Sequence, residues 1–146
     1  LKDLLQDAPV SAEQIIVIAF NHEVVSESKR QLPDIRAFWL KNLKGSRYSR
    51  DPARAVAESL TTLKQCNADG LSFSSDSAKL RAELIPALRS AGLSTHCWTV
   101  DDLVVADELH RLGIDSITTN RPGWLRRRLN GAGESLYQHR QIHQNR

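Results

Sequence analysis

The sequence contains no methionine, only two cysteines, and no hydrophobic run that approaches the roughly 20 residues needed to cross a bilayer. Two cysteines are too few for a disulfide framework, and Cys97 lies in a segment that we interpret as a buried strand, so we expect a reducing cytoplasm. Lys2 and Asp3 precede no long apolar core, which excludes a signal-peptide pattern. Because the chain opens on leucine and lacks methionine, we expect it to be part of something longer.

The glycine-rich signatures of nucleotide-binding proteins are also missing, since neither Gly-x-Gly-x-x-Gly nor a P-loop occurs. The net charge is only +3, with basic residues gathered in 41–54 and 126–128. Basic clusters can bind phosphate groups, including nucleic acid. We interpret these two as a solvated loop and the outer face of a last helix, because no nucleic-acid-binding motif is present. The expectation is therefore no nucleic-acid partner and no membrane span.

What the sequence does contain is an alternation of short β-branched or aromatic runs with amphipathic helical stretches. In the clearest unit, 93–122, a strand leads into a helix that starts at Leu103 and stops at Gly113, and a second strand follows. Parallel strands need a crossover of about a dozen residues or more, usually a helix, so the rhythm predicts an α/β protein. It predicts five strands, near 15–20, 35–40, 70–74, 94–100 and 115–119.

Local signals add detail to this scheme. Asn21 is expected to cap a helix over 22–32, and Asp51 with Pro52 to begin the next helix. Asp101 is expected to cap the helix that starts at Leu103. The β-branched run in 15–18 is typical of a strand buried on both faces. We expect 41–51 to be the longest irregular stretch and a flexible loop.

Three further expectations concern one helix and the chain ends. Pro86 lies inside a predicted helix over 78–91, where it favours a kink or an interruption. Residues 1–7 are predicted to be the end of a helix. We divide the chain into one domain at 1–130 and a polar tail at 131–146.

Five parallel strands fit an open sheet or an incomplete arc of a closed eight-stranded barrel, and periodicity does not decide between them. In both architectures, chemistry gathers where strands end and helices begin. The candidate segments are therefore 98–102 and 118–122.

Three segments, in this order, resemble glycerophosphodiester phosphodiesterases: Ile-Ala-Phe-Asn (18–21), Cys-Trp-Thr-Val-Asp (97–101) and Gly-Ile-Asp-Ser-Ile-Thr-Thr-Asn-Arg-Pro (113–122). Those enzymes have a Ser-Phe-Asp-like strand end, a Trp-Thr-Val-Asn segment and a Gly-Val-Asp-Gly-Ile-Thr-Asp-Pro-like ending. The resemblance spans 1–130 and implies a TIM barrel, of which this chain would be strands four to eight. It also implies cleavage of a glycerophosphodiester with a divalent metal, calcium or magnesium, and two histidines.

Departures from the family pattern fall on the catalytic half. The family's His-Arg-Gly opening, Glu-x-Asp metal ligands, second His-Asp and Glu-x-Lys strand are not found, and 13–15 does not reproduce the last of these. We therefore expect no catalytic residue, no metal ligand and no turnover in this chain alone. Ala19 replaces the usual Ser, Asn120 replaces the usual Asp, and Arg121 is an addition. These changes leave the head group open.

Candidate pocket residues lie at the predicted strand ends. The resemblance implies that Trp98 flanks a glycerol or choline-like group, and Phe20 is a second lining candidate. Arg121, beside a helix N-terminus, is a possible phosphate contact. The structural alternatives are a core tryptophan at 98 and a surface salt bridge at 121.

Other polar residues have simpler explanations. We expect His96 to be a core residue on the same face as Trp98, and His22 to be exposed at a helix start. Helix caps or turns explain a set of aspartates without any metal: Asp76, Asp101, Asp102 and Asp115.

A second interpretation is a non-catalytic binding or assembly module. An arc of a barrel leaves two sheet edges unpaired, and unpaired edges favour self-association.

Overall fold

The computed structural model describes residues 11–129, and five parallel strands form its single sheet. The strands are β1 (Ile16–Ala19), β2 (Arg36–Asn42), β3 (Gly70–Ser74), β4 (Ser94–Cys97) and β5 (Ser116–Ile117). They neighbour one another in chain order, from β1 to β5. A doubly wound sheet reverses its strand order at a switch point. The uninterrupted order therefore identifies an arc of a barrel and resolves the alternative that periodicity left open.

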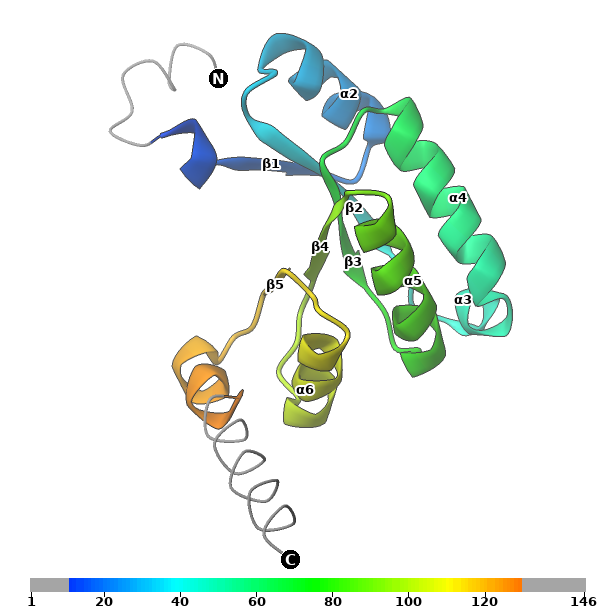
Figure 1. The fold of residues 1–146 in the computed structure, drawn as a ribbon, viewed down its shortest axis with the longest axis vertical. Coiled ribbons are helices and arrows are strands. Elements are labelled where there is room, and N and C mark those ends of the chain that lie inside the picture. The colour runs from blue at the N-terminus through cyan, green and yellow to red at the C-terminus, as the bar shows by residue number, and fades with distance from the viewer. Residues whose placement is uncertain (1–10, 130–146) are drawn as a thin grey trace, which may run out of the picture.

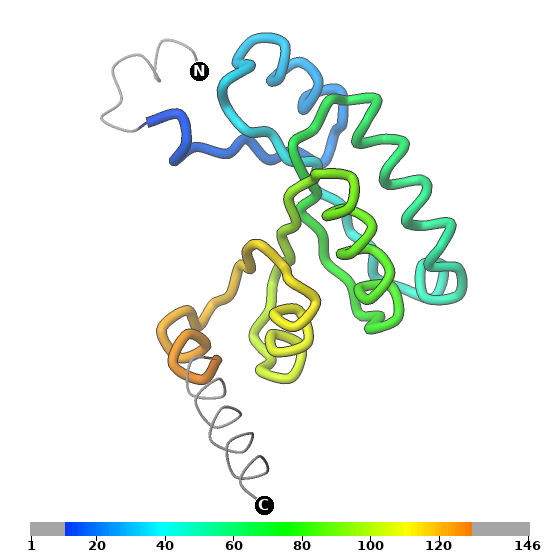
Figure 2. Tube along the Cα trace, in the orientation of Figure 1, coloured from blue at the N-terminus to red at the C-terminus, as the bar shows by residue number. Residues whose placement is uncertain are grey.

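Helices connect the strands and cover one side of the sheet. They are α2 (His22–Gln31), α3 (Ser46–Arg50), α4 (Pro52–Gln65), α5 (Ala78–Ser90) and α6 (Leu103–Arg111), with a 3₁₀ turn η1 (Ala12–Gln14) before β1. The last described helix occupies 122–129. Figure 1 shows α2, α4 and α5 together on one side of the sheet, and the trace in Figure 2 passes alternately through strands and helices.

Most helix boundaries follow the capping signals. Asn21 Oδ1 accepts a hydrogen bond from Glu23 N at 2.8 Å, and Asp51 Oδ1 accepts one from Arg54 N at 3.0 Å. The α5 helix runs through Pro86 without interruption. The predictions for 1–7 and for the tail at 131–146 lie outside the described residues.

Three local expectations are wrong. Asp102, not Asp101, caps α6, because its Oδ1 accepts from Val105 N at 3.0 Å. Strands β4 and β5 end at Cys97 and Ile117, earlier than predicted. The stretch 41–51 is not one irregular loop: its first two residues finish β2, and 46–50 form α3.

The hydrophobic core lies between the sheet and the helices. Leu71 and Phe73 of the central strand project from one face of it and have no exposed surface. Burying one such side chain stabilises a fold by about 1.5–3 kcal/mol, so this layer holds the helices on the sheet. Fully buried helix residues that face it are Leu63, Leu80, Leu84, Leu88 and Leu109.

Strand β1 is half-buried on one face and exposed on the other, which contradicts the expectation for 15–18. Val17 and Ala19 pack against the core, whereas Ile16 is 39% exposed and Ile18 is 54% exposed. Residues 11–129 therefore cover the inner face of β1 only in part. A continuous apolar run predicts burial on both faces of a strand. Among the described residues, the inner face of β1, which carries Ile16 and Ile18, is not buried in this way.

Two aspartates bind neighbouring strands together at the N-terminal end of the sheet. Asp69 Oδ2 accepts from Ala37 N at 2.8 Å and pairs with Lys29 Nζ at 2.8 Å. Asp115 Oδ2 accepts from Thr95 N at 2.7 Å and from Thr95 Oγ1 at 2.8 Å. Each aspartate stands just before a strand and holds the strand that precedes it, so this end of the sheet has a fixed register.

A salt bridge joins α5 to α6. Arg81 is 4% exposed, and its Nε and Nη2 donate to Glu108 at 3.0 and 2.7 Å. Its Nη1 donates to Ser75 O at 2.9 Å. The guanidinium thereby also fixes the loop that leads from β3 into α5.

Candidate functional site

The carboxyl ends of the strands bring together the two predicted pocket residues. Phe20 follows β1 and Trp98 follows β4, and their rings meet edge to face with centroids 6.2 Å apart. Phe20 is 62% exposed. Trp98 N donates to Phe73 O at 2.9 Å, which keeps Trp98 beside the end of β3. Edge-to-face contact at this spacing is favourable for aromatic pairs, so the two rings form one aromatic corner.

A second tryptophan secures the strand end that carries Phe20. Trp39 of β2 donates its indole Nε1 hydrogen to Phe20 O at 2.9 Å. The Trp98 Nε1, in contrast, is buried and has no hydrogen-bond partner among the described residues.

Asp101 joins the loop after β4 to the loop after β5. Its carboxylate accepts from Asn120 N at 2.8 Å, from Asn120 Nδ2 at 2.7 Å and from Thr119 Oγ1 at 2.9 Å. The two donors of Asn120, followed by the Thr119 hydroxyl, lower the pKa of Asp101. This aspartate therefore acts as an ionised link between the two candidate segments and not as the helix cap that we predicted.

Arg121 stands at the start of the last described helix. Its guanidinium lies 4.2 Å from the centroid of the Trp124 ring, and its backbone N donates to Thr119 Oγ1 at 3.1 Å. With the described residues it forms no salt bridge. The arginine is held in place by an aromatic face while its donors stay accessible.

His96 lies on the inner face of β4, two residues before Trp98. Its Nε2 is 2.9 Å from Thr118 Oγ1, and burial lowers the pKa of the imidazole. A half-buried, neutral histidine with a hydroxyl partner fits the structural role that the sequence suggested.

The carboxylates at this end of the sheet are engaged with protein groups. Asp76 accepts from Gly45 N at 3.2 and 3.3 Å, Asp102 caps α6, and Asp101 serves the link described above. A hard cation requires several converging oxygens. Within residues 11–129, no group of three or more His, Cys, Asp or Glu residues is placed to hold a metal.

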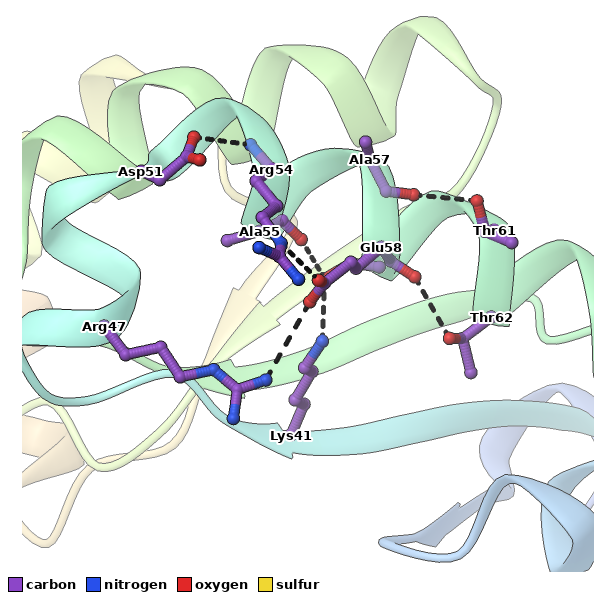
Figure 3. Close-up of polar contacts among 10 residues, drawn as sticks. Lys41, Arg47, Asp51, Arg54, Ala55, Ala57, Glu58, Thr61 and Thr62 are labelled. Atoms are coloured by element: carbon purple, nitrogen blue, oxygen red, sulfur yellow. Dashed lines mark hydrogen bonds and ion pairs between the residues drawn. The ribbon is translucent and has the colours of Figure 1, made fainter.

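Basic residues of 41–54, which the sequence analysis assigned to a solvated loop, instead form a charged cluster with α4 on the helix side of β2, drawn in Figure 3. Lys41 is half-buried, with Nζ 3.2 Å from Ser59 Oγ and 4.6 Å from the Trp39 ring centroid, and burial lowers its pKa. Glu58 accepts from Arg54 Nε at 2.8 Å and lies 3.9 Å from Arg47 Nη2. Residues two positions apart in a strand point to the same face, so Lys41 had to share the helix-facing side of β2 with Trp39. That spacing is the signal that could have predicted the position of Lys41.

Two surface hollows lie away from the aromatic corner. One of about 340 Å³ runs along α2 between Asn21 and Leu32, and one of about 230 Å³ lies between α3 and α4 beside Arg47 and Arg54. Neither is lined by Phe20 or Trp98.

No described helix is long and apolar enough to span a membrane.

The arc of parallel strands with its outer helices is a partial TIM barrel, as the sequence predicted. The chain belongs to the Glycerophosphoryl diester phosphodiesterase family, whose model matches residues 2–124. No curated protein matches it.

Two solved structures illustrate the likeness. A glycerophosphodiester phosphodiesterase from Parabacteroides distasonis is 23% identical with a TM-score of 0.62, and the match covers 84% of this chain and 45% of that one. A phosphodiesterase from Oleispira antarctica, in complex with the product sn-glycerol-3-phosphate, is 17% identical with a TM-score of 0.61, and the match covers 86% and 43%. The chain spans less than half the length of each.

Proposed function

We propose that this chain is the C-terminal part of a metal-dependent phosphodiesterase that hydrolyses a glycerophosphodiester to glycerol 3-phosphate and an alcohol. The observation that carries the proposal is the family match over 2–124. The relative from Oleispira antarctica, which holds sn-glycerol-3-phosphate, supports the substrate class.

In this proposal the chain supplies one wall of the substrate pocket. Trp98 and Phe20 contact the substrate, and Arg121 contacts its phosphate. A divalent metal, calcium or magnesium, would supply charge neutralisation and orientation of the attacking oxygen. The described carboxylates do not fit such a metal, because their oxygens accept hydrogen bonds from protein groups. Metal ligands and catalytic histidines would belong to a part of the barrel beyond this chain.

The phosphate role of Arg121 is supported by its surroundings. A guanidinium presents a planar set of donors that suits phosphate oxygens. Stacking on Trp124 at 4.2 Å restricts the side chain without using those donors.

Both cysteines are free thiols, which supports a reducing cytoplasm as the proposed compartment.

Hydrolysis of glycerophosphocholine and glycerophosphoethanolamine, with added calcium or magnesium, tests the enzyme proposal. We expect no turnover by this chain alone and metal-dependent turnover by the longer polypeptide encoded by its gene. Turnover by the chain alone would place the reacting groups within these residues. No turnover by the longer polypeptide would remove the enzyme proposal.

A second candidate is an assembly module without catalysis, favoured by the exposed inner face of β1. Ile16, Ile18 and Phe20 place three apolar side chains next to a strand edge that no strand of residues 11–129 pairs, a combination prone to association. Light scattering after size exclusion tests it, because a monomer at high concentration contradicts self-association. Ile18→Ser should shift any dimer towards monomer.

A further inference from the structure

Trp39 and Trp98 differ in what their indole nitrogens bind. Trp39 is 8% exposed and donates to Phe20 O at 2.9 Å, as a buried indole N–H normally does. The Trp98 Nε1 is equally shielded from solvent but has no acceptor among residues 11–129. A buried donor without a partner loses its hydration and gains nothing in return. Such a group in a folded protein calls for an explanation.

The other unpartnered buried polar atom lies on the same face of the sheet. Ser72 Oγ, in a residue that is 1% exposed, also lacks a partner among the described residues. Ser72 is in register with His96, which precedes Trp98 by two residues and shares its face. The helix-facing side of β3 and β4 is occupied by apolar core and by the hydrogen-bonded Thr95. Both unmatched polar atoms therefore belong to the inner, pocket side of the barrel.

The indole of Trp98 is held in position from several directions. Trp98 N donates to Phe73 O, the Phe20 ring packs against its ring, and the Asp101 link to Asn120 begins three residues later. A donor fixed before its acceptor arrives avoids the entropy cost of being ordered at binding. The fixed position and the missing acceptor together indicate a site for a ligand oxygen.

We propose that the Trp98 indole N–H donates a hydrogen bond to a hydroxyl or phosphate oxygen of the glycerol phosphate part of the substrate. This inference rests on the proposed function and deepens it. An indole N–H is a donor only, whereas the quaternary ammonium of a choline group carries no acceptor. The atom Nε1 thus assigns Trp98 to the glycerol phosphate side and not to a quaternary ammonium head group.

Nuclear magnetic resonance of the ¹⁵N-labelled chain tests the proposal directly, with sn-glycerol 3-phosphate as the probe. Three tryptophans give three indole N–H signals, and Trp98→Phe and Trp124→Phe assign them. We expect the Trp98 signal to shift saturably, with Trp39 as the internal control because its N–H is already bonded. A titration to ~50 mM detects binding much weaker than millimolar, so an unmoved Trp98 signal overturns the proposal.

Kinetics of the longer polypeptide separate this inference from the proposed function. Trp98→Phe keeps the aromatic surface and removes the donor, so kcat/KM should fall about fivefold to tenfold, mainly through KM. Hydrolysis that is unchanged by Trp98→Phe overturns the donor role and leaves the proposed function standing. Absence of hydrolysis together with a saturable Trp98 shift rejects the enzyme and supports the donor.

Discussion

Asn120 donates twice to Asp101, from its backbone N at 2.8 Å and from its side-chain Nδ2 at 2.7 Å. In the family pattern that the sequence resembles, an Asn follows Trp-Thr-Val and an Asp follows the last strand. Here the two residue types have changed places. The pair still comprises one amide and one carboxylate, so two apparent departures from the pattern form a single complementary contact.

Exchanging the pair should preserve stability, whereas changing one member should not. Asp101→Asn removes a carboxylate that accepts three hydrogen bonds, and Asn120→Asp sets two carboxylates against each other. Each should lower the free energy of unfolding, and hence the urea midpoint, relative to the wild type. The double exchange restores one donor amide and one acceptor carboxylate and should recover most of the loss. Urea unfolding measures all three, with Asp34→Asn as a surface control; three equal losses would contradict the pairing.

The salt bridge between α5 and α6 should respond asymmetrically to the loss of either partner. Glu108→Ala leaves the guanidinium of Arg81 buried without a counter-charge and should cost about 3–5 kcal/mol. Arg81→Met leaves Glu108, whose side chain is 30% exposed, able to regain water and should cost less. Chemical unfolding of both variants and of the Arg81→Met, Glu108→Leu double variant tests this. A double variant less stable than Glu108→Ala would contradict it.

Acid should destabilise the chain through His96. Burial lowers the pKa of His96 below its ordinary 6.5, so the unfolded chain binds this proton more readily than the folded chain. The stabilising contribution is complete above the unfolded pKa of 6.5 and is lost as pH falls through the folded pKa. Urea unfolding at about pH 7.5 and about pH 5.5 should show a smaller decline in His96→Gln. An equal decline in that variant would assign the effect to other groups.

Neither cysteine should react while the chain is folded. Burial raises the pKa of Cys97 to about 11 and also raises that of Cys66. At about pH 8 the Cys97 thiolate fraction is then ~0.1%, and only the thiolate is nucleophilic. Mass spectrometry after iodoacetamide treatment should find both thiols unmodified in buffer and both modified in urea. Rapid alkylation in buffer would mean that the sheet opens locally.

If the proposed function holds, hydrolysis should depend on Arg121, because its guanidinium would contact the phosphate of the substrate. Arg121→Ala in the longer polypeptide should reduce kcat/KM about tenfold or more, as expected for a hydrogen bond to a charged group. Arg121→Lys should recover only part, since an ammonium lacks the planar fork. Arg126→Ala, an exposed arginine on the same helix, is the matched control. A loss as large in Arg126→Ala would indicate a general charge effect.

Sequence patterns located the elements of this fold because their signals are local. Asn21, Asp51 and Pro52 start helices at the positions that capping chemistry dictates, and the strand at 70–74 has its predicted bounds. The barrel topology required the resemblance or the structure, since strand order depends on contacts far apart in sequence. For Phe20 and Trp98, the sequence predicted only that both residues lie at the carboxyl ends of the strands. It did not predict that their rings are in contact.

The errors have physical causes of the same kind. Asp101 satisfies the local pattern of a helix cap, but Asn120 and Thr119 offer it three donors from another strand end, and Asp102 takes its place. The run at 15–18 is apolar on both faces, yet within residues 11–129 the inner-face residues Ile16 and Ile18 remain exposed, because burial depends on contacts that a local pattern does not contain. The unpartnered N–H of Trp98 has no sequence signal, because it is defined by what surrounds a buried atom.

Asp69 and Asp115 fasten adjacent strands at the end of the sheet opposite to Trp98 and Arg121. Under the proposed function, strand registration and substrate contact would fall at different ends of the same strands. Substitutions around the aromatic corner can accumulate without shifting strand registry, which leaves that end of the strands free to change on an unchanged scaffold.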